Sequence, residues 1–337
     1  MKILFPLTRA GTGTDIFTDN LASGLRKLTH TADMKFLPGW SGFIPPVMGK
    51  LCDTSTYDLI HANSWNGFGF TGSKPLVVTE HLVVHDPLLN PYKTRLQRFY
   101  HSYIFHNEQK SFVSADIVVS ISKYVQKKMQ EEFGFYDSTL IFNGIDETVF
   151  NRVTIERTSF LKKYSIPEDK KIIFFAGNPT SRKGGDLLPR IMNNLGDDYV
   201  LIITGGLREK SNFKTPNIIS TGKIPTSELI AAYNISDLFL FPSRLEGFCL
   251  SILEAMSCGI PVVTTNVSSL PEQVIDEKGG VLCPIDDISA FTNAIRYITE
   301  DENLMKKMGN FNRQRILDLF TLDKMTREYV KIYEKLV

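Results

Sequence analysis

The sequence contains little cysteine, and its cysteines do not cluster. None of them forms a C-x-x-C pair, so their spacing predicts neither a zinc site nor a redox dithiol. We therefore expect buried free thiols in a reducing compartment. The four thiols are Cys52, Cys249, Cys258 and Cys283.

Long apolar runs and an excess of charge of one sign are also missing. No run approaches the roughly 18 apolar residues of a membrane span, and the apolar stretch after Lys2 is too short for a signal peptide. The formal net charge of the 337 residues is +1, which gives no global field for nucleic acid. These absences favour a cytoplasmic protein of enzyme size with no nucleic acid partner.

Two series of short apolar runs alternate with amphipathic helical stretches. The runs are rich in Val, Ile and Phe, which is typical of parallel strands buried on both faces. Two such series predict an α/β protein with two doubly wound, Rossmann-like domains at 1–150 and 151–320, and an amphipathic helix at 321–337. The first series is 2–7, 34–38, 57–62, 75–81, 116–122 and 139–145, and the second is 171–177, 199–206, 217–222, 237–243, 261–265 and 280–284.

A glycine-containing turn follows the first predicted strand. Gly11 and Gly13 would let backbone N–H groups approach a phosphate or a sugar in front of a helix N-terminus. Ile16 occupies the place of the third glycine in a dinucleotide-binding signature, which counts against a dehydrogenase. A plain tight turn is an equally good interpretation of this stretch.

Three histidines lie close to predicted strand ends in the N-terminal half. In open α/β sheets, ligands bind outside the carboxyl ends of the strands. His81 directly follows the fourth strand, and we interpret it as a group that binds a hydroxyl or moves a proton. We favour a structural interpretation for His61 and His85, in which nearby groups satisfy the ring.

The first strand of the second series runs into a basic loop that contains glycine. Gly177 gives the backbone freedom there, and the adjacent cations Arg182 and Lys183 suit a diphosphate, one as a fork and one as a compact charge. The next strand ends in Gly205 and Gly206, which again permit a close approach of ligand to backbone. A solvated surface turn is the alternative interpretation of the basic pair.

The stretch 242–265 places two carboxylates at the start of an apolar helix. Glu246 lies just before a helix that we expect to run from about Phe248 to Cys258, with Gly259 as its C-terminal cap. Glu254 lies eight residues later, about two turns along a similar face. Free N–H groups from Gly247 to Leu250 would stabilise an anion, and the two acids would accept hydrogen bonds from sugar hydroxyls. This order of groups fits a nucleotide sugar better than the alternative, a helix-stabilising acid followed by an exposed one.

These residues resemble the retaining glycosyltransferases of family 4, which have the GT-B fold. The stretch 242–263, PSRLEGFCLSILEAMSCGIPVV, is similar to the family's P-S-x-x-E-G-F-G-L-x-x-x-E-A-M-A-x-G-x-P-V-V. The resemblance implies that Glu246 contacts the donor sugar and that Glu254 binds the ribose. It also implies that the backbone N–H groups of Phe248, Cys249 and Leu250 lie near the diphosphate, with Cys249 standing in place of a glycine.

Other stretches extend the resemblance over most of the chain. The segment 177–184 is similar to the family's G-R-x-x-x-x-K-G, which gives Lys183 the diphosphate role. Asn178 stands where the family has arginine, so Arg182 is a candidate for the missing charge. The turn 221–229 resembles the one that holds the base, which implies contact near Ile224.

The N-terminal half carries two further similarities. VVTEH at 77–81 resembles the family's strand-end histidine, which implies a site role for His81. NGIDETVF at 143–150 resembles the N-G-I-D-x-x-x-F that closes the first domain, and the family's terminal helix crosses back to that domain, as 321–337 would.

The resemblance implies transfer of a sugar from a UDP- or GDP-sugar to an acceptor hydroxyl, with retention at the anomeric carbon. No cofactor is expected, and no D-x-D motif for a metal occurs, so Arg182, Lys183 and the helix start at Gly247 would stabilise the leaving diphosphate. The acceptor, a glycan, a lipid-linked molecule or a small molecule, stays open, as does the pathway of glycan, glycolipid or polysaccharide biosynthesis. Alternatives are an epimerase or phosphorylase of the same fold, or a non-catalytic protein that binds nucleotide sugars.

A basic and aromatic stretch at 91–110 is a candidate for peripheral contact with the inner face of a membrane. Cations and aromatic side chains interleave there with a single acid, Glu108. A packed helix with a solvated basic face is the more usual structure for such a pattern. The residues are Tyr92, Lys93, Arg95, Arg98, Phe99, Tyr100, Tyr103, Phe105 and Lys110.

Overall fold

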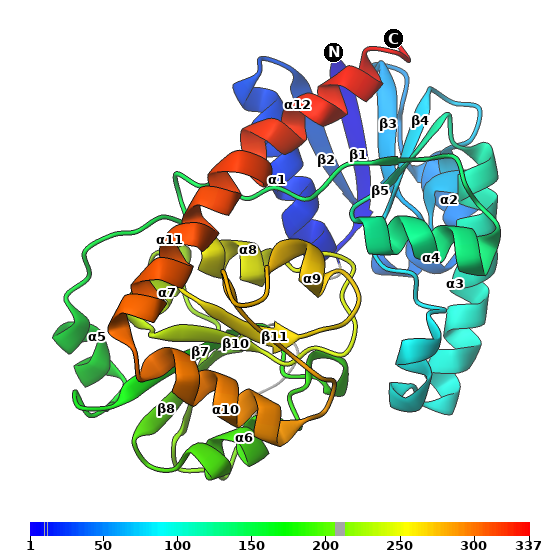
Figure 1. Ribbon diagram of the computed structural model, residues 1–337. Helices are drawn as coiled ribbons and strands as arrows, with labels where there is room; N and C mark the ends of the chain where they lie inside the picture. Colours follow the sequence, from blue (N-terminus) through cyan, green and yellow to red (C-terminus); the bar gives the residue numbers. More distant parts are fainter. Residues whose placement is uncertain (10, 12, 206–212) are drawn as a thin grey trace. The chain divides into compact units, whose positions relative to one another are not determined.

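The computed structural model describes residues 1–9, 11, 13–205 and 213–337, so Gly206 lies outside the described residues. The chain divides into two compact units. One unit comprises Met1–Gly144 together with Leu322–Val337, and the other comprises Ile145–Thr321. Each unit contains one six-stranded sheet with helices packed around it (Figure 1).

Both sheets are parallel throughout. Their orders are β2-β1-β3-β4-β5-β6 and β12-β11-β10-β7-β8-β9, so each is doubly wound about its first strand, as the alternating pattern of the sequence predicts. Each predicted apolar run overlaps one of these strands. The strands are β1 (Lys2–Thr8), β2 (Thr31–Leu37), β3 (Leu59–Asn63), β4 (Leu76–Glu80), β5 (Ile117–Ser120), β6 (Ser138–Leu140), β7 (Lys171–Ala176), β8 (Tyr199–Thr204), β9 (Ile218–Gly222), β10 (Leu238–Phe241), β11 (Val262–Thr265) and β12 (Gly280–Cys283).

Helices connect the strands and cover the sheets. The α-helices are α1 (Gly13–Lys27), α2 (Pro45–Leu51), α3 (Arg95–Ser114), α4 (Lys123–Phe133), α5 (Arg157–Lys163), α6 (Leu188–Leu195), α7 (Thr226–Ile235), α8 (Leu250–Ser257), α9 (Leu270–Gln273), α10 (Ile288–Thr299), α11 (Glu302–Leu319) and α12 (Leu322–Tyr333). The 3₁₀ helices are η1 (Gly39–Phe43), η2 (Gly67–Phe70), η3 (Pro87–Tyr92) and η4 (Ser181–Lys183). No helix of the described residues has the length and apolar composition needed to cross a bilayer.

The core of the N-terminal unit lies between its sheet and the helix pair α1 and α12. Figure 1 shows these two helices side by side, and Phe17 of α1 and Tyr329 of α12 meet edge to face there. The helices approach closely because α1 has a glycine at the crossing. A Cβ atom on Gly24 would lie 2.1 Å from the hydroxyl oxygen of Thr326. The C-terminal helix is therefore an integral part of this unit's core.

The core of the C-terminal unit is built on strands that are buried on both faces. Residues 172–175 of β7 and 238–241 of β10 are fully enclosed, which explains why their sequences read as unbroken apolar runs. Helix α8 follows β10 and ends where Gly259 adopts a left-handed φ of 71°. The helix thus stops where the sequence predicts, although it begins at Leu250 rather than at Phe248.

Candidate functional site

Two loops leave the carboxyl ends of neighbouring strands in the C-terminal unit. The first follows β7 and contains the basic pair, and the second follows β10 and contains Glu246. Because β7 and β10 pair directly, their loops lie next to each other. The site is built mainly from these two loops and the first turns of α8.

Arg182 and Glu246 join the two loops through an ion pair. The guanidinium Nη1 of Arg182 lies 2.8 Å from Oε1 of Glu246, and it also donates to the carbonyl of Leu245. Ser243 donates to the same carboxylate oxygen at 3.0 Å. Among the described residues no group donates to the second oxygen, Oε2, and none accepts from Nη2 of Arg182. Each residue of the pair therefore keeps hydrogen-bonding capacity for a ligand.

The buried Arg244 holds the basic loop in place through hydrogen bonds, a role that the local sequence does not predict. It is 3% exposed, and it contacts Asp186 through two bonds of 2.6 and 2.8 Å. It also donates to Asp286 at 2.6 Å and to the carbonyl of Ser181. Nothing in the local pattern distinguishes this arginine from an exposed one, because its partners lie 42 to 63 residues away.

Glycine allows the basic loop to pack tightly against the end of β10. Gly184 has a φ of 70°, and a Cβ atom there would lie 2.1 Å from the carbonyl oxygen of Pro242. Gly177 has a φ of 125°, and a Cβ atom on it would lie 3.0 Å from the ammonium of Lys183. That ammonium sits 5.4 Å from the ring centroid of Phe241. No described acid pairs with Lys183, so its charge is available at the site.

Glu254 is a nearly enclosed carboxyl held by a tyrosine. The residue is 8% exposed, and the hydroxyl of Tyr233 donates to its Oε2 at 2.7 Å. Burial raises the pKa of Glu254 to about 7, against the opposing effects of the Tyr233 hydroxyl and the Lys183 charge. No described group donates to Oε1, so one oxygen remains for a ligand.

The start of α8 offers fewer free amides than the sequence predicts. The expectation that the N–H of Cys249 is free is wrong, because it donates to Oε1 of Gln273 at 2.9 Å. The amide of Gln273 in turn donates to the carbonyl of Cys249 at 2.8 Å, so the turn is held from both sides. The N–H groups of Gly247 and Leu250 meet no acceptor among the described residues. Phe248 is buried and packs edge to face on Phe320.

Three further predicted positions lie near the carboxyl ends of strands in this unit. Ile224 is half-buried in the loop between β9 and α7, where a base is expected to bind. Asn178 follows Gly177, and its Oδ1 is buried without a partner in the described structure. The N–H of Gly205 donates to the carbonyl of Gly222 at 3.0 Å, so the amide of Gly205 is used in a backbone hydrogen bond at the ends of β8 and β9.

His81 lies at the carboxyl end of β4 in the N-terminal unit. Its Nε2 donates to Oδ1 of Asn63 at 3.1 Å, and its ring meets Phe17 edge to face at 4.7 Å. Burial lowers the pKa of His81 to about 3, so the ring is neutral near pH 7. With Nε2 donating, Nδ1 carries the lone pair and meets no described donor. Gly13 opens α1 and is exposed, and a Cβ atom there would meet nothing within 4 Å.

The other two histidines have structural surroundings. His61 is 3% exposed and is hydrogen-bonded to Tyr333 at 2.6 Å and to Thr79 at 2.7 Å. His85 packs on Phe105 with ring centroids 4.5 Å apart. The ring of His61 is therefore satisfied by nearby groups, as we favoured from the sequence. The ring of His85 is packed, but its Nδ1 is buried without a hydrogen-bond partner among the described residues, so the same expectation is not confirmed for His85.

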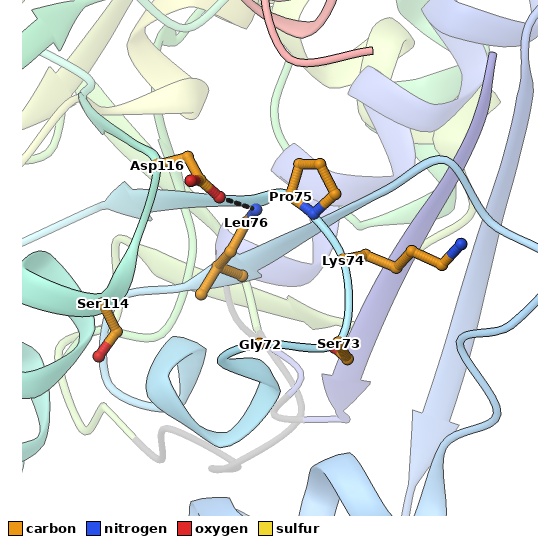
Figure 2. Close-up of a pocket in the computed structure, with 7 residues that line it drawn as sticks. All are labelled: Gly72, Ser73, Lys74, Pro75, Leu76, Ser114 and Asp116. Atoms are coloured by element: carbon orange, nitrogen blue, oxygen red, sulfur yellow. Dashed lines mark hydrogen bonds between the residues drawn. The ribbon is translucent and has the colours of Figure 1, made fainter.

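A shallow hollow of about 300 Å³ lies away from these residues (Figure 2). It is lined by residues 72–76 together with Ser114 and Asp116, and Asp116 accepts the N–H of Leu76 at 2.7 Å. This is the amino-terminal end of β4, opposite to the end where His81 lies. No three His, Cys, Asp or Glu side chains gather as a metal site would require in the part of the chain described.

Two family models match the chain in succession. Residues 29–149 match the model described as Glycosyltransferase Family 4, and residues 156–315 match the model described as Glycosyl transferases group 1. The second match includes both loops of the site and helix α8.

Curated relatives carry glycosyltransferase names. An uncharacterized glycosyltransferase of Methanocaldococcus jannaschii is 29% identical over 286 residues, which cover 78% of this chain and 69% of the relative. A GDP-mannose-dependent alpha-(1-6)-phosphatidylinositol monomannoside mannosyltransferase of Mycolicibacterium smegmatis is 28% identical over 225 residues, 60% of this chain and 58% of the relative. The chain thus spans little more than half of some of these relatives.

Solved structures share the fold over the full length of the chain. The sucrose-phosphate synthase of Thermosynechococcus elongatus superposes with a TM-score of 0.84 at 19% identity, covering 100% of this chain and 99% of that one. HepE of Anabaena, solved in complex with UDP and glucose, superposes with a TM-score of 0.80 at 18% identity and covers 100% of both chains. At such identities the likeness concerns the fold alone.

Proposed function

Because the chain belongs to glycosyltransferase family 4 and has the GT-B fold, we propose that it transfers a sugar from a nucleoside diphosphate sugar to an acceptor hydroxyl, with retention at the anomeric carbon. The observation that supports this most is the arrangement around α8. Two cations and two carboxylates, each with an unused polar atom, surround amides that are free to bind an anion.

The proposed donor lies along the first turns of α8. Its diphosphate faces Lys183, the free side of Arg182 and the N–H groups of Gly247 and Leu250. Oε1 of Glu254 accepts a ribose hydroxyl, and Oε2 of Glu246 accepts a hydroxyl of the transferred sugar. The unpartnered Oδ1 of Asn178 and the backbone beside Ile224 complete the contacts, the latter with the base.

Charge stabilisation carries the chemistry in this proposal. Negative charge grows on the β-phosphate as the glycosidic bond breaks, and Lys183, Arg182 and the helix start stabilise it without a metal ion. Loss of one such donor typically costs about 2.7–4 kcal/mol in the transition state, a factor of about 10² to 10³ in rate. The Glu246 ion pair keeps Arg182 oriented before the donor arrives.

His81 positions a hydroxyl and does not act as a cation in this proposal. A ring whose pKa is about 3 is neutral under ordinary conditions. Its Nδ1 lone pair accepts a hydrogen bond, while Asn63 holds the ring through Nε2. The acceptor's proton then passes to the departing diphosphate.

The donor is proposed to be a UDP- or GDP-sugar. One structural neighbour is solved with UDP bound, and one relative is named as GDP-mannose-dependent. Names of relatives also mention a phosphatidylinositol mannoside and O-antigen biosynthesis, which favours an acceptor in glycan, glycolipid or polysaccharide biosynthesis.

A thermal-shift screen with UDP-, GDP- and ADP-sugars tests the donor site. A ligand at 100 times its dissociation constant adds about 2.7 kcal/mol to the unfolding free energy, which is a readily measured shift. Glu254→Ala should abolish the shift. Glu302→Ala is the control, because Glu302 is an exposed acid of the same unit at the start of α11, outside the site. If no nucleotide sugar stabilises the wild type, the proposal fails.

Product analysis then separates the reaction classes. Release of nucleoside diphosphate together with a new glycoside, only when acceptor is present, supports transfer. Conversion of the donor without acceptor indicates an epimerase, and use of phosphate with a glycoside indicates a phosphorylase. Donor binding without turnover on any acceptor indicates a binding protein.

A further inference from the structure

Large apolar side chains are exposed in two segments of the N-terminal unit that are far apart in sequence. In and beside η1, Trp40 is 56% exposed, Phe43 57% and Ile44 50%. In the first turns of α3, Leu96 and Phe99 are each 78% exposed, and Tyr100 is partly exposed. Exposed aromatic side chains in such number are costly unless something covers them.

The fold joins these two segments into one surface. The rings of Phe43 and Tyr100 lie 5.7 Å apart, and the hydroxyl of Tyr103 donates to the carbonyl of Phe43. Leu96, Tyr100 and Tyr103 follow the i, i+4, i+7 spacing of one helical face. We call this surface the docking face, and it consists of Trp40, Phe43, Ile44, Leu96, Phe99, Tyr100 and Tyr103.

The exposed charges of the segments that form and flank the docking face, residues 34–52 and α3, are basic. Arg95 and Arg98 are exposed on α3, and Lys50 is exposed on α2. The single acid of α3, Glu108, is 2% exposed, and residues 34–52 contain no acid. Aromatic side chains rimmed by arginine and lysine are suited to the headgroup region of an anionic bilayer, where the rings enter the interface and the cations meet phosphates.

Only some residues of the stretch 91–110 belong to the docking face. Lys93 is not a free surface charge, because its ammonium donates to the carbonyl of Val84 at 2.6 Å. Phe105 stacks on Phe133 with ring centroids 4.4 Å apart and is not exposed. The docking face instead uses the first turns of α3 and gains η1, which no local pattern links to them.

The position of the docking face suits a membrane-bound acceptor. η1 follows the carboxyl end of β2, and α3 follows the carboxyl end of β4, the same edge at which His81 lies. In Figure 1, α3 continues past the carboxyl ends of the strands. A bilayer on this face would present its headgroups at the edge of the sheet that binds ligands in α/β folds.

We propose that the docking face binds the surface of an anionic lipid bilayer. A second copy of the chain is the less suitable occupant, because a symmetric contact through this face would bring Arg95 and Arg98 of both copies together without an acid between them. The proposal goes beyond the proposed function, and its test uses no sugar donor, so the two fail independently.

Vesicle flotation tests the proposal with the full chain. The vesicles are phosphatidylcholine alone or phosphatidylcholine with phosphatidylglycerol, at low and at high salt. The wild type should float only with the anionic vesicles, and less at high salt. Leu96→Ser with Phe99→Ser should weaken binding about tenfold or more, because the burial of two apolar side chains is lost. Arg95→Gln with Arg98→Gln should weaken it about fivefold for each cation.

The matched control is Val113→Ser on the same helix. Val113 is 86% exposed but lies at the other end of α3, outside the docking face. It should bind vesicles as the wild type does, and melting curves should show that all variants fold. The proposal is overturned if the wild type ignores anionic vesicles, or if Val113→Ser loses as much binding as the double variant. It is also overturned if light scattering shows a wild-type dimer that Leu96→Ser with Phe99→Ser converts to monomer while vesicle binding is unchanged.

Discussion

Replacing Glu254 by glutamine should stabilise the protein at neutral and alkaline pH while it removes a proposed ribose contact. The carboxyl is 8% exposed and its pKa is raised to about 7, chiefly by burial. In the unfolded chain the same group has a pKa of 4.5. Between these two pKa values the native state therefore binds a proton that the unfolded state has released.

The sign and size of the effect follow from these two values. Below pH 4.5 the group is protonated in both states and contributes no pH dependence. Between pH 4.5 and about 7 the unfolding free energy falls by about 1.4 kcal/mol per pH unit, and above pH 7 the full cost of about 3 kcal/mol is present. Glutamine has no charge to bury and keeps an oxygen for the Tyr233 hydroxyl, so Glu254→Gln should recover up to about 3 kcal/mol above pH 7.

Urea unfolding of the wild type and of Glu254→Gln between pH 4 and pH 8 measures the difference directly. Other titrating groups cancel in that difference because both proteins contain them. Glu228→Gln is the matched control: its carboxyl also accepts a tyrosine hydroxyl, at 2.5 Å, but its pKa is lowered by Lys163 and Tyr164. This control should therefore destabilise the protein at pH 8.

A variant Glu254→Gln that is less stable than the wild type at pH 8 would refute the reasoning. So would a stability difference that stays constant from pH 4 to pH 8, because it would mean that the carboxyl titrates normally in the native state. A recovery that appears in Glu228→Gln as well would show that loss of any acid helps, and burial would then not be the cause.

Three other substitutions test packing, a buried hydrogen bond and a buried charge in the two units. Gly184→Ala should destabilise the C-terminal unit by about 1–3 kcal/mol in urea unfolding, because the methyl group meets the carbonyl of Pro242 at a positive φ; an unchanged midpoint would mean that the loop can relax. Tyr333→Phe should cost about 1–2 kcal/mol, because a buried nitrogen of His61 loses its partner, whereas Tyr136→Phe on the exposed surface should cost nothing measurable. Glu108→Gln should raise the unfolding free energy at pH 7 and leave it unchanged at pH 4, since burial and the neighbouring Glu80 raise the pKa of Glu108 well above its ordinary value; equal effects at both pH values would contradict this.

Much of the architecture could be predicted from local sequence. Strands buried on both faces must be apolar at every position, so β7 and β10 appear as unbroken apolar runs. Gly259 ends α8 because glycine reaches the left-handed region at little cost. Lys183 and Glu246 were also recognisable, because each follows its strand within a few residues and a parallel sheet collects such positions at one edge.

The contacts that decide how these groups work were not predictable in the same way. Gln273 takes the amide of Cys249 from 24 residues away, and Arg244 holds a loop 63 residues away. The pKa of Glu254 depends on burial beside Tyr233, which lies on another helix. Local pattern cannot reveal these partners, because each depends on which strands become neighbours.

The sequence by itself determined the order of strands and helices, the glycines at the turns and the set of side chains at the strand ends. The tertiary structure alone decided which of those groups are already bonded and which remain free, and it joined η1 to α3 in one exposed surface. The physical reason is that periodicity and backbone preference act within a few residues. Burial, ion pairing and surface shape arise only when distant segments pack together.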